Sequence, residues 1–342
     1  MTALRPYQDA AIASVLDYWA RGGENPLVDM ATGLGKSVVI AELMRRLLTD
    51  YPQMRVLMLV HVRELVSQNF QALVRLWPQA PAGIYSAGLG RRDSHHRITC
   101  ASIQSVYKRA AELAPRDLVL IDEAHLVPHG GEGMYRTLLD ALRTETPDMR
   151  VVGFTATPYR LGAGRLDRGA DKLFDEIVYS YGVGEGIRDG WLSPITARRG
   201  EAEIDVSGVA RRGGEFVAGA LEAAADDAAV IAAAADEIMA RGADRRSWLA
   251  FCTGVKHAAH VAEALRARGV AAAVVTGETP TAERDRLIRD FKAGQLRCLT
   301  NANVLTTGFD APGVDLIAML RPTLSTGLYV QMIGRGTRLS AG

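Results

Sequence analysis

The sequence is short of cysteine, of net charge and of long apolar runs, and each shortage excludes a class of protein. The three cysteines, Cys100, Cys252 and Cys298, are far apart. Their spacing matches neither a zinc site nor a disulfide framework, so we expect buried, reduced thiols. The net charge is +1. A nucleic-acid partner must therefore be held by local basic patches and not by a strongly cationic protein.

No apolar stretch approaches the roughly 18 residues that cross a bilayer, and the amino-terminal residues do not form a secretory signal. We therefore expect a cytoplasmic, monomeric protein with no membrane partner. The length of 342 residues predicts about two domains.

Apolar, strand-like runs alternate with helical patterns in two blocks, which predicts an α/β fold with two domains and mainly parallel sheets. The first block has expected strands at 26–30, 55–61, 97–101, 117–122 and 150–155 and expected helices at 38–48, 63–76, 103–113 and 133–143. The second has expected strands at 247–252, 271–276, 296–301 and 314–320 and expected helices at 255–268, 281–293 and 325–334.

The alternation lapses over 162–214, a stretch rich in glycine and arginine, although 174–179 has the pattern of a strand. The alanine-rich run that follows, 218–240, predicts an amphipathic helix broken near Asp226. We expect a first domain over 1–190, a linker over 191–225 and a second domain over 226–342.

The firmest chemical signal is the loop Ala-Thr-Gly-Leu-Gly-Lys-Ser between the first strand and the first helix of the alternation. Gly33 and Gly35 permit a tight path that points backbone N–H groups at phosphate oxygens. Lys36 supplies a cation for the terminal phosphates of a nucleoside triphosphate, and the Ser37 hydroxyl is a magnesium ligand. The strict phosphate-loop pattern requires glycine where this chain has Met30.

Two neighbouring carboxylates, Asp122 and Glu123, follow the apolar run 118–121. That position is the carboxyl edge of a parallel sheet, where ligands of open α/β sheets bind. Asp122 there holds the metal, and Glu123 accepts a proton from an attacking water. A solvated turn is the ordinary explanation of one acidic pair, but the upstream phosphate loop argues against it. Together the two elements predict magnesium-dependent hydrolysis of ATP.

These motifs resemble those of superfamily 2 helicases of the DEAD/DEAH-box type. Asp122-Glu-Ala-His125 resembles the DEAH form of their Walker B motif. The phosphate loop resembles their motif I, which often lacks the first glycine, so Met30 fits the family. Further stretches resemble the adenine-reading segment (4–8) and motifs Ia (60–68), III (155–158), V (304–312) and VI (331–338), in family order. The resemblance runs nearly end to end and implies two tandem RecA-like domains.

The resemblance implies roles for further residues in binding and hydrolysing ATP. The implied nucleotide contacts are Arg5, Gln8, Thr32, Gly33, Gly35, Lys36, Ser37, Gly308 and Asp310. Asp310 reaches the ribose, or is merely a turn acid before Ala-Pro. The implied catalytic residues of motif VI are Gln331, Arg335 and Arg338. The two arginines are three apart on a predicted helix and so face one way, and they act when the domains close on ATP.

The remaining candidate residues concern nucleic acid and its coupling to ATP. Hydroxyls, loop amides and arginines contact phosphates without reading sequence, and the candidates of this kind are Arg63, Arg91, Arg92, Thr276, Gly277, Thr306 and Thr307. The coupling residues are His125, Thr155 and Thr157, unless the two threonines only cap a strand. The pair His95-His96 has no carboxylate or thiol ligands near it in the sequence, so we do not expect it to bind metal.

Three stretches, at 61–66, 86–95 and 305–317, further resemble the bacterial RadD (YejH) proteins, which are linked to DNA repair. Proteins of that group continue past motif VI into a cysteine-rich zinc-binding element. This sequence stops at Gly342, so we expect either a trimmed helicase core or a relative that lacks the module.

The leading hypothesis is an ATP-dependent helicase or translocase that acts on DNA in repair or recombination. Repair proteins and single-strand-binding proteins are the expected protein partners. The alternatives are an RNA helicase, an ATP-switched clamp that does not unwind, and an ATPase without a nucleic-acid partner. All of them use the same motifs, so the sequence does not separate them.

Overall fold

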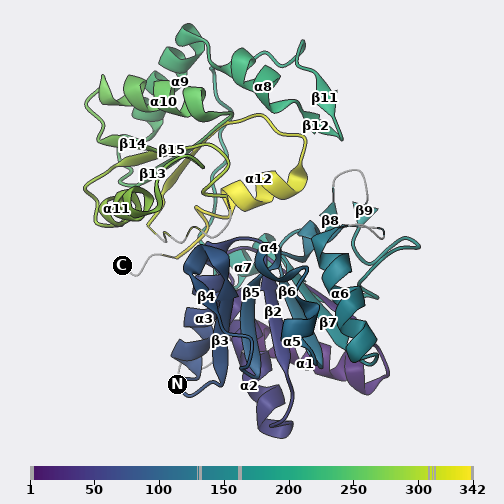
Figure 1. The fold of residues 1–342 in the computed structure, drawn as a ribbon. Helices are drawn as coiled ribbons and strands as arrows, with labels where there is room; N and C mark the ends of the chain where they lie inside the picture. Colours follow the sequence, from purple (N-terminus) through teal and green to yellow (C-terminus); the bar gives the residue numbers. More distant parts are fainter. Residues whose placement is uncertain are drawn as a thin grey trace. The chain divides into compact units, whose positions relative to one another are not determined.

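The structure is a computed structural model that describes residues 4–128, 130, 133–160, 164–306, 309, 311 and 313–339. The chain divides into two compact units, Met1–Gly186 and Ile187–Gly342. Each unit is an α/β fold with a mainly parallel central sheet, as the alternation predicts (Figure 1). The stretch 191–225, where we expected a linker, groups with the second unit and contains a hairpin and a helix.

The main sheet of the first unit has eight strands in the order β10-β1-β7-β6-β2-β5-β3-β4. Neighbouring strands are parallel except for β3 and β4. The strands are β1 (Leu27–Met30), β2 (Val56–Val60), β3 (Ala82–Ser86), β4 (Arg91–Arg92), β5 (Ile98–Ser102), β6 (Leu118–Asp122), β7 (Arg150–Thr155) and β10 (Ile177–Tyr181), and a separate hairpin joins β8 (Tyr159–Arg160) to β9 (Gly164–Arg165).

Helices flank this sheet on both faces because its strands are apolar on both faces. Successive side chains of a strand point to opposite faces, and every residue of β2 and β6 is buried. One core contains alternate strand residues and side chains of α4 (Ile103–Val106), α5 (Ala110–Leu113) and α6 (Met134–Glu145). A second set of helices, α1 (Pro6–Ala20), α2 (Lys36–Asp50) and α3 (Arg63–Leu76), pack on one another and on the strands.

The helix expected over 103–113 is wrong in one respect, since the structure has two short helices there. The Arg109 amide donates to the Val106 carbonyl at 2.8 Å, a three-residue bond that ends the first turn before α5 begins. Short segments complete the first unit: the 3₁₀ turns η1 (Ala87–Leu89) and η2 (Ala124–Leu126), and α7 (Val183–Arg188) at the boundary.

The second unit is built on a four-stranded, fully parallel sheet in the order β14-β15-β13-β16. Its strands are β13 (Trp248–Cys252), β14 (Ala272–Val275), β15 (Cys298–Asn301) and β16 (Leu316–Leu320), and its hairpin joins β11 (Arg211–Arg212) to β12 (Glu215–Phe216). Its helices are α8 (Ala218–Ala225), α9 (Ala228–Arg241), α10 (Val255–Arg266), α11 (Thr281–Lys292) and α12 (Thr326–Ile333).

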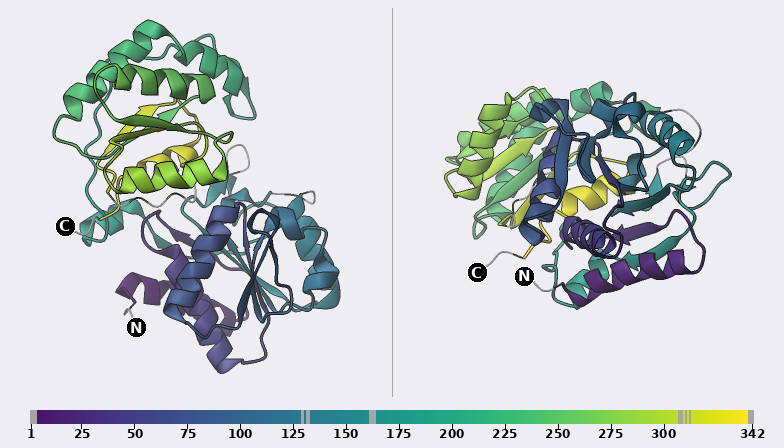
Figure 2. Two further views of the ribbon diagram at one scale, coloured as in Figure 1. Left: turned by 60° about the vertical axis from the view of Figure 1, so that its left-hand side comes forward. Right: turned by 60° about the horizontal axis from the view of Figure 1, so that its bottom comes forward.

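Helices cover both faces of this sheet, as Figure 2 shows from further directions, and a hydrophobic core lies on each face. Alternate strand residues pack on α9 and α10 in one core and on α11 and α12 in the other. The predicted break of the alanine-rich helix is confirmed: α8 ends at Ala225, and the Asp227 carboxylate caps α9 by accepting from the amides of Ala229 and Val230.

All three cysteines are buried and free of disulfides, as predicted. Burial raises the pKa of the Cys100 and Cys298 thiols to about 12. In the part of the chain that the structure describes, no helix combines the length and the hydropathy needed to cross a membrane.

Parallel strands bring the polar candidates of each unit to one sheet edge. In the first unit β1, β6 and β7 end at Met30, Asp122 and Thr155, and these strands are consecutive neighbours in the sheet. In the second unit Thr276 and Arg321 directly follow β14 and β16. The carboxyl edge of each sheet is therefore where we expect ligands to bind.

Candidate functional site

The predicted phosphate loop connects β1 to α2 and has the backbone of an anion cradle. Gly33 and Gly35 have φ of +89° and +76°, values that residues other than glycine rarely adopt. A Cβ on Gly35 would also lie 2.7 Å from the Gln8 amide nitrogen. No side chain caps the start of α2 at Lys36. Its first amides and its helix dipole therefore suit a phosphate group.

The amino-terminal turn of α1 braces this loop. Gln8 Nε2 and the Tyr7 hydroxyl both donate to the Leu34 carbonyl at 3.0 Å, and the Arg5 amide donates to Gln8 Oε1 at 3.0 Å. Arg5 and Gln8 thus lie beside the loop where we predicted adenine contacts. Sequence reasoning missed Tyr7, whose ring stacks on Tyr181 of β10 at 4.6 Å, since no local pattern pairs residues so far apart.

Lys36 folds back over the loop, and its Nζ donates to the Met30 carbonyl at 3.2 Å. Thr32 is buried within the loop, and Ser37 is half-buried in the first turn of α2. The ammonium is thus held at the end of β1 by one weak bond to a neutral acceptor, which a phosphate oxygen can replace.

Asp122 is buried at the end of β6, and each of its oxygens accepts one hydrogen bond. Asn69 Nδ2 donates to Oδ2 at 3.1 Å, and the Glu123 amide donates to Oδ1 at 3.0 Å. Burial, and then the neighbouring Glu123 carboxylate, raise the pKa of Asp122, so a cation at this position would stabilise its charged form. Asn69 was missed by sequence reasoning, and the only available signal was its place in α3 just beyond motif Ia.

Glu123 has two unusual properties at once. Its backbone has φ of +55°, which is rare for a residue with a side chain. Its Oε2 atom is buried and has no hydrogen-bond partner. A buried acceptor without a protein donor is costly, and such groups are concentrated at functional sites.

His125 lies 3.5 Å from this Glu123 oxygen through its Nδ1 atom. Burial, and then the Lys36 charge, lower the pKa of His125 to about 4, so its imidazole is neutral at pH 7 and its contact with Glu123 is one between a neutral ring and a carboxylate. The same Nδ1 is 3.0 Å from Thr155 Oγ1. The Thr155 hydroxyl accepts from the Thr157 amide at 3.1 Å. A chain of contacts therefore leads from Glu123 to the loop after β7, through the residues that we predicted to couple ATP to nucleic acid.

Magnesium fits this edge only as a cation shared with a nucleotide. The described residues contain no group of three or more histidine, cysteine or acidic side chains arranged for a metal. Ser37 and Asp122 are the two oxygen ligands that we predicted. Magnesium sites in phosphate-processing proteins often have one or two protein ligands, with phosphate oxygens and water completing the octahedron.

The predicted nucleic-acid arginines of the first unit already have protein partners. Arg63 opens α3 and pairs with Glu64 at 2.9 Å. Arg91 pairs with Asp93, and Arg92 with Glu112 at 2.8 Å. The Arg91 and Arg92 side chains remain 47% and 58% exposed. Both can still meet a phosphate, although neighbouring carboxylates partly offset their charge.

The expected helical placement of Arg335 and Arg338 is wrong, because α12 ends at Ile333 and both residues lie in the turn beyond it. They also differ in environment. Arg335 is buried and donates to the Phe309 carbonyl at 2.6 Å and to the Thr306 carbonyl. Arg338 is half-buried, and burial lowers the pKa of its guanidinium. Arg335 thus ties motif VI to motif V within the second unit.

Of the other second-unit candidates, Thr276 and Gly277 follow β14 at the carboxyl edge of the sheet. Gln331 is buried in α12. Thr276 is buried and its amide donates to Thr279 Oγ1 at 2.9 Å, whereas a side chain on Gly277 would meet nothing within 4 Å. Thr306 is buried, with its carbonyl bonded to Arg335. Three further candidates lie outside the described residues: Thr307, Gly308 and Asp310.

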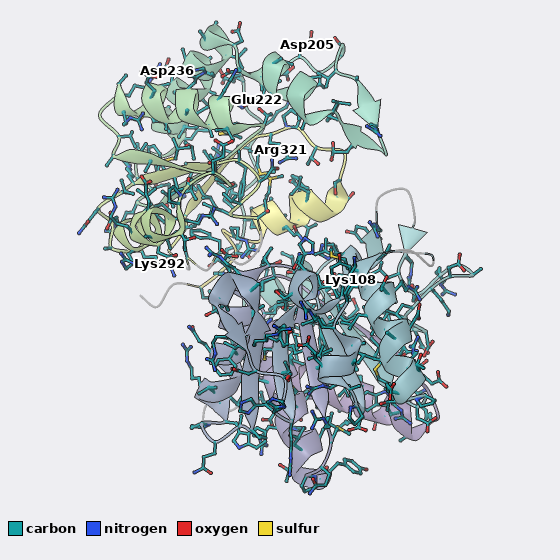
Figure 3. The ribbon with its side chains drawn as sticks, in the orientation of Figure 1. Lys108, Asp205, Glu222, Asp236, Lys292 and Arg321 are labelled. Carbon is teal, nitrogen blue, oxygen red and sulfur yellow. The ribbon has the colours of Figure 1, made fainter. Side chains whose placement is uncertain are left out.

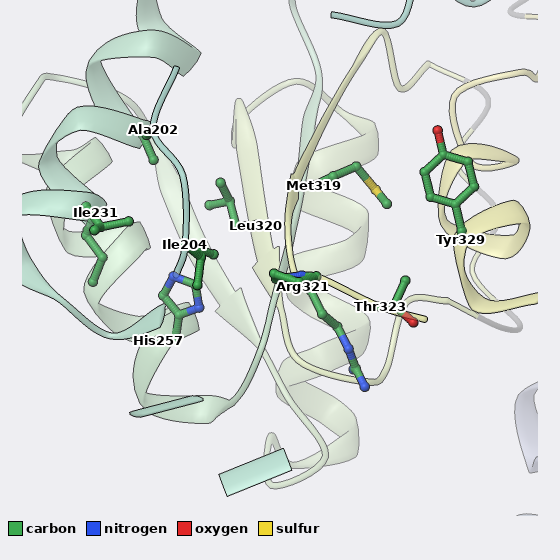
Figure 4. A pocket seen from close by; sticks show the side chains of 12 residues that line it. Ala202, Ile204, Ile231, His257, Met319, Leu320, Arg321, Thr323 and Tyr329 are labelled. Atoms are coloured by element: carbon green, nitrogen blue, oxygen red, sulfur yellow. The ribbon is translucent and has the colours of Figure 1, made fainter. Parts of the chain in front are cut away.

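A pocket of about 330 Å³ lies elsewhere, in the second unit between the segment 202–204, α9, β16 and α12 (Figure 4). Its wall is mostly apolar, with Arg321, Thr323 and Tyr329 at its polar side. None of the predicted nucleotide residues lines it. The predicted phosphate loop belongs to the first unit and does not line this pocket.

Two family models match parts of the chain. Residues 1–160 match the family model "Type III restriction enzyme, res subunit", and residues 230–340 match "Helicase conserved C-terminal domain". Together the two matches include the phosphate loop, the carboxylate pair and motif VI.

Curated relatives match nearly the whole chain. "Putative ATP-dependent helicase IRC3" of Saccharomyces cerevisiae is 30% identical over 98% of this chain and 49% of its own length. "Putative mitochondrial ATP-dependent helicase irc3" of Schizosaccharomyces pombe is 31% identical over 99% of this chain and 55% of its own length. The chain thus spans about half the length of these relatives.

Among solved structures, "The fragment structure of a putative HsdR subunit of a type I restriction enzyme from Vibrio vulnificus YJ016" has a TM-score of 0.72 and 25% identity. The likeness covers 98% of this chain and 61% of that one.

Proposed function

The chain contains the two-part core of a superfamily 2 helicase, and from this premise we propose that it is an ATP hydrolase that uses ATP to move along DNA. One observation carries the proposal. The phosphate loop, Asp122 and the buried, unpartnered Glu123 oxygen belong to one sheet edge in the first unit. That set can hold a triphosphate and accept a proton from water.

In this proposal the first unit binds the nucleotide and starts the reaction. The amides at the start of α2 and the Lys36 ammonium bind the phosphates. Ser37 and Asp122 hold the magnesium ion, which when bound offsets the charge of the phosphate oxygens. Glu123 takes the proton of the attacking water. Its lack of a hydrogen-bond donor leaves that oxygen available as a base.

The second unit contributes charge and motion. We assign Arg338 to the γ-phosphate oxygens, where a well-placed arginine is worth roughly 10³–10⁵ in rate. Arg335 and Gln331 support that turn. Because these residues belong to a different unit from Lys36, hydrolysis requires the units to close, and closure converts ATP turnover into movement. The contact chain from Glu123 to Thr157 is the proposed route by which turnover reaches the nucleic-acid contacts.

DNA is the proposed polymer. The matches to restriction-enzyme subunits support DNA over RNA, since restriction enzymes act on DNA. The exposed arginines 91 and 92 and the hydroxyl and amide groups at the second sheet edge suit contacts to a sugar–phosphate backbone without sequence readout. The RadD-like stretches support a role in DNA repair, with repair or single-strand-binding proteins as partners. We further propose that the acting form is a cytoplasmic monomer.

The test is ATP hydrolysis measured with single-stranded DNA, duplex DNA, branched DNA and RNA in parallel. We expect the largest stimulation by DNA. Lys36→Ala should abolish turnover by removing the phosphate cation, and Glu123→Gln should abolish it while ATP binding persists. Equal rates with and without every polymer would refute the motor.

An ATP-switched clamp is the second candidate, because the same residues would hold and release nucleic acid without unwinding. A strand-displacement assay run beside the ATPase separates the two. DNA-stimulated hydrolysis with strand displacement supports the helicase. The same hydrolysis without displacement or translocation supports the clamp.

A further inference from the structure

Two carboxylates of the segment 211–226, which contains β11, β12 and α8, each accept hydrogen bonds at the amino-terminal end of a helix. Glu215 binds at the start of α12. Its Oε2 accepts from the Thr323 hydroxyl at 2.6 Å and from the Ser325 amide at 3.1 Å, and its Oε1 accepts from the Leu324 amide at 3.1 Å. The Phe216 amide supplies a fourth bond at 2.9 Å.

These donors keep Glu215 ionised. Burial opposes its charge, but the bonds from Thr323 and from three amides outweigh burial and lower the pKa of Glu215. Each oxygen of Glu215 accepts two hydrogen bonds. In a glutamine one of these oxygens is replaced by an NH₂ group, which cannot accept, so the two donors on that side lose their acceptor. A glutamine therefore breaks half of this arrangement at nearly constant size.

Glu222 does the same for α10 (labelled in Figure 3). Its Oε1 accepts from the Lys256 amide at 2.8 Å and from the His257 amide at 3.4 Å. It lies directly over Gly254, where an added Cβ would come within 2.1 Å of the Glu222 carboxyl carbon. The segment is thus fixed at two points, on two helices of the same unit.

The two helices differ in what they contain. α12 contains Gln331, and the turn after it holds Arg335 and Arg338. The Thr337 carbonyl in that turn accepts from the Ser193 amide at 2.7 Å. The stretch from the loop before α12 to the turn after it is therefore bonded at both ends, by Glu215 at one end and by Ser193 at the other. α10 contains none of the predicted catalytic or binding residues. Thr323 lies on the loop between β16 and α12, beside the pocket described above (Figure 4).

We propose that Glu215 is a positioning residue for motif VI: by binding the loop that leads into α12, up to its N-cap Ser325, it sets the direction in which Arg338 is presented to the nucleotide. The inference rests on the proposed function, because the position of Arg338 affects a rate only if it acts in hydrolysis. Misplacing a catalytic group by about 1 Å costs up to about 100-fold in rate.

The experiment compares Glu215→Ala with Glu222→Ala in the whole chain, using DNA-stimulated ATPase at saturating DNA. The two changes remove the same side chain from the same segment. Glu215→Ala should lower kcat about tenfold or more with the KM for ATP nearly unchanged, whereas Glu222→Ala should keep the wild-type kcat. Glu215→Gln should fall between wild type and alanine. Thr323→Val, which removes the hydroxyl that donates to Glu215, should lower kcat several-fold. This variant tests the same contact if Glu215→Ala does not fold.

A double-mutant cycle with Arg338→Ala gives the sharpest result. Adding Glu215→Ala to Arg338→Ala should not lower kcat further, because Glu215 is proposed to act through Arg338. Losses that multiply, or equal losses in Glu215→Ala and Glu222→Ala, overturn the positioning role and leave a general effect on folding. An unchanged kcat in both Glu215→Ala and Thr323→Val also overturns it. Absence of hydrolysis by the wild-type protein refutes the proposed function itself and the inference with it.

Discussion

The two units hold their buried charges in opposite ways. In the first unit Glu123 has left-handed backbone and a buried oxygen without a hydrogen-bond partner. In the second unit buried Arg335 donates to two backbone carbonyls of its own fold. A buried carboxylate oxygen without a donor on a strained backbone points to function, whereas a buried guanidinium bonded to backbone carbonyls of its own unit supports the fold. We conclude that Glu123 is kept for a reactant and that Arg335 holds motif VI together.

The largest predicted effect separates the two arginines of motif VI. Arg338→Ala should lower kcat about 10³-fold with little change in the KM for ATP, because it removes charge stabilisation that is needed mainly in the transition state. Thermal melting should stay near the wild-type value, since Arg338 is only half-buried. A rise in KM at constant kcat would make Arg338 a ground-state binding residue. Steady-state ATPase kinetics and a melting curve decide.

Arg335→Ala should act on stability first. It removes the donors to Thr306 and Phe309 and leaves buried carbonyls without partners, at a cost of about 3 kcal/mol in the free energy of unfolding. Arg335→Lys should recover part of this, because one ammonium cannot reproduce the planar pair of donors. Urea denaturation measures both. If Arg335→Ala were as stable as wild type, Arg335 would not support the fold, and the contrast with Glu123 would be wrong.

The neutral His125 should make the protein less stable in mild acid. Its pKa of about 4 in the folded chain is below the unfolded value of about 6.5, so the unfolded state binds the extra proton. Stability should therefore fall by roughly 2 kcal/mol between pH 8 and pH 5 through this group. His125→Asn should lose less stability than wild type over the same interval. Parallel pH slopes in urea unfolding would show that His125 is not the cause.

The smallest effect is a gain. Glu123→Gln should abolish turnover yet raise the free energy of unfolding by about 1 kcal/mol, because it removes a buried charge next to Asp122. The matched change Glu112→Gln alters a carboxylate with several donors, among them Arg92 and Arg109, and should stabilise nothing. A loss of stability in Glu123→Gln would mean that the carboxylate supports the fold.

The sequence predicted most elements because their patterns are local. The helix at 63–76 and the strand at 150–155 are where the apolar spacing places them, and the break in the alanine-rich run coincides with an aspartate that caps the next helix. Prediction from the sequence failed where tertiary packing determines the local conformation. The helix expected over 103–113 is two turns, and the arginines expected on one helical face lie in a turn with unlike surroundings.

By itself the sequence determined the fold class, the phosphate loop and the acidic pair, since each depends on a few adjacent residues with a fixed chemistry. Only the tertiary structure revealed the supports of these groups: Tyr7 on the loop, Asn69 on Asp122, Arg335 on motif V and Glu215 on α12. Each support joins residues far apart in the chain. The spacing of residues along the chain does not predict such a contact, because the contact depends on how helices and strands pack together.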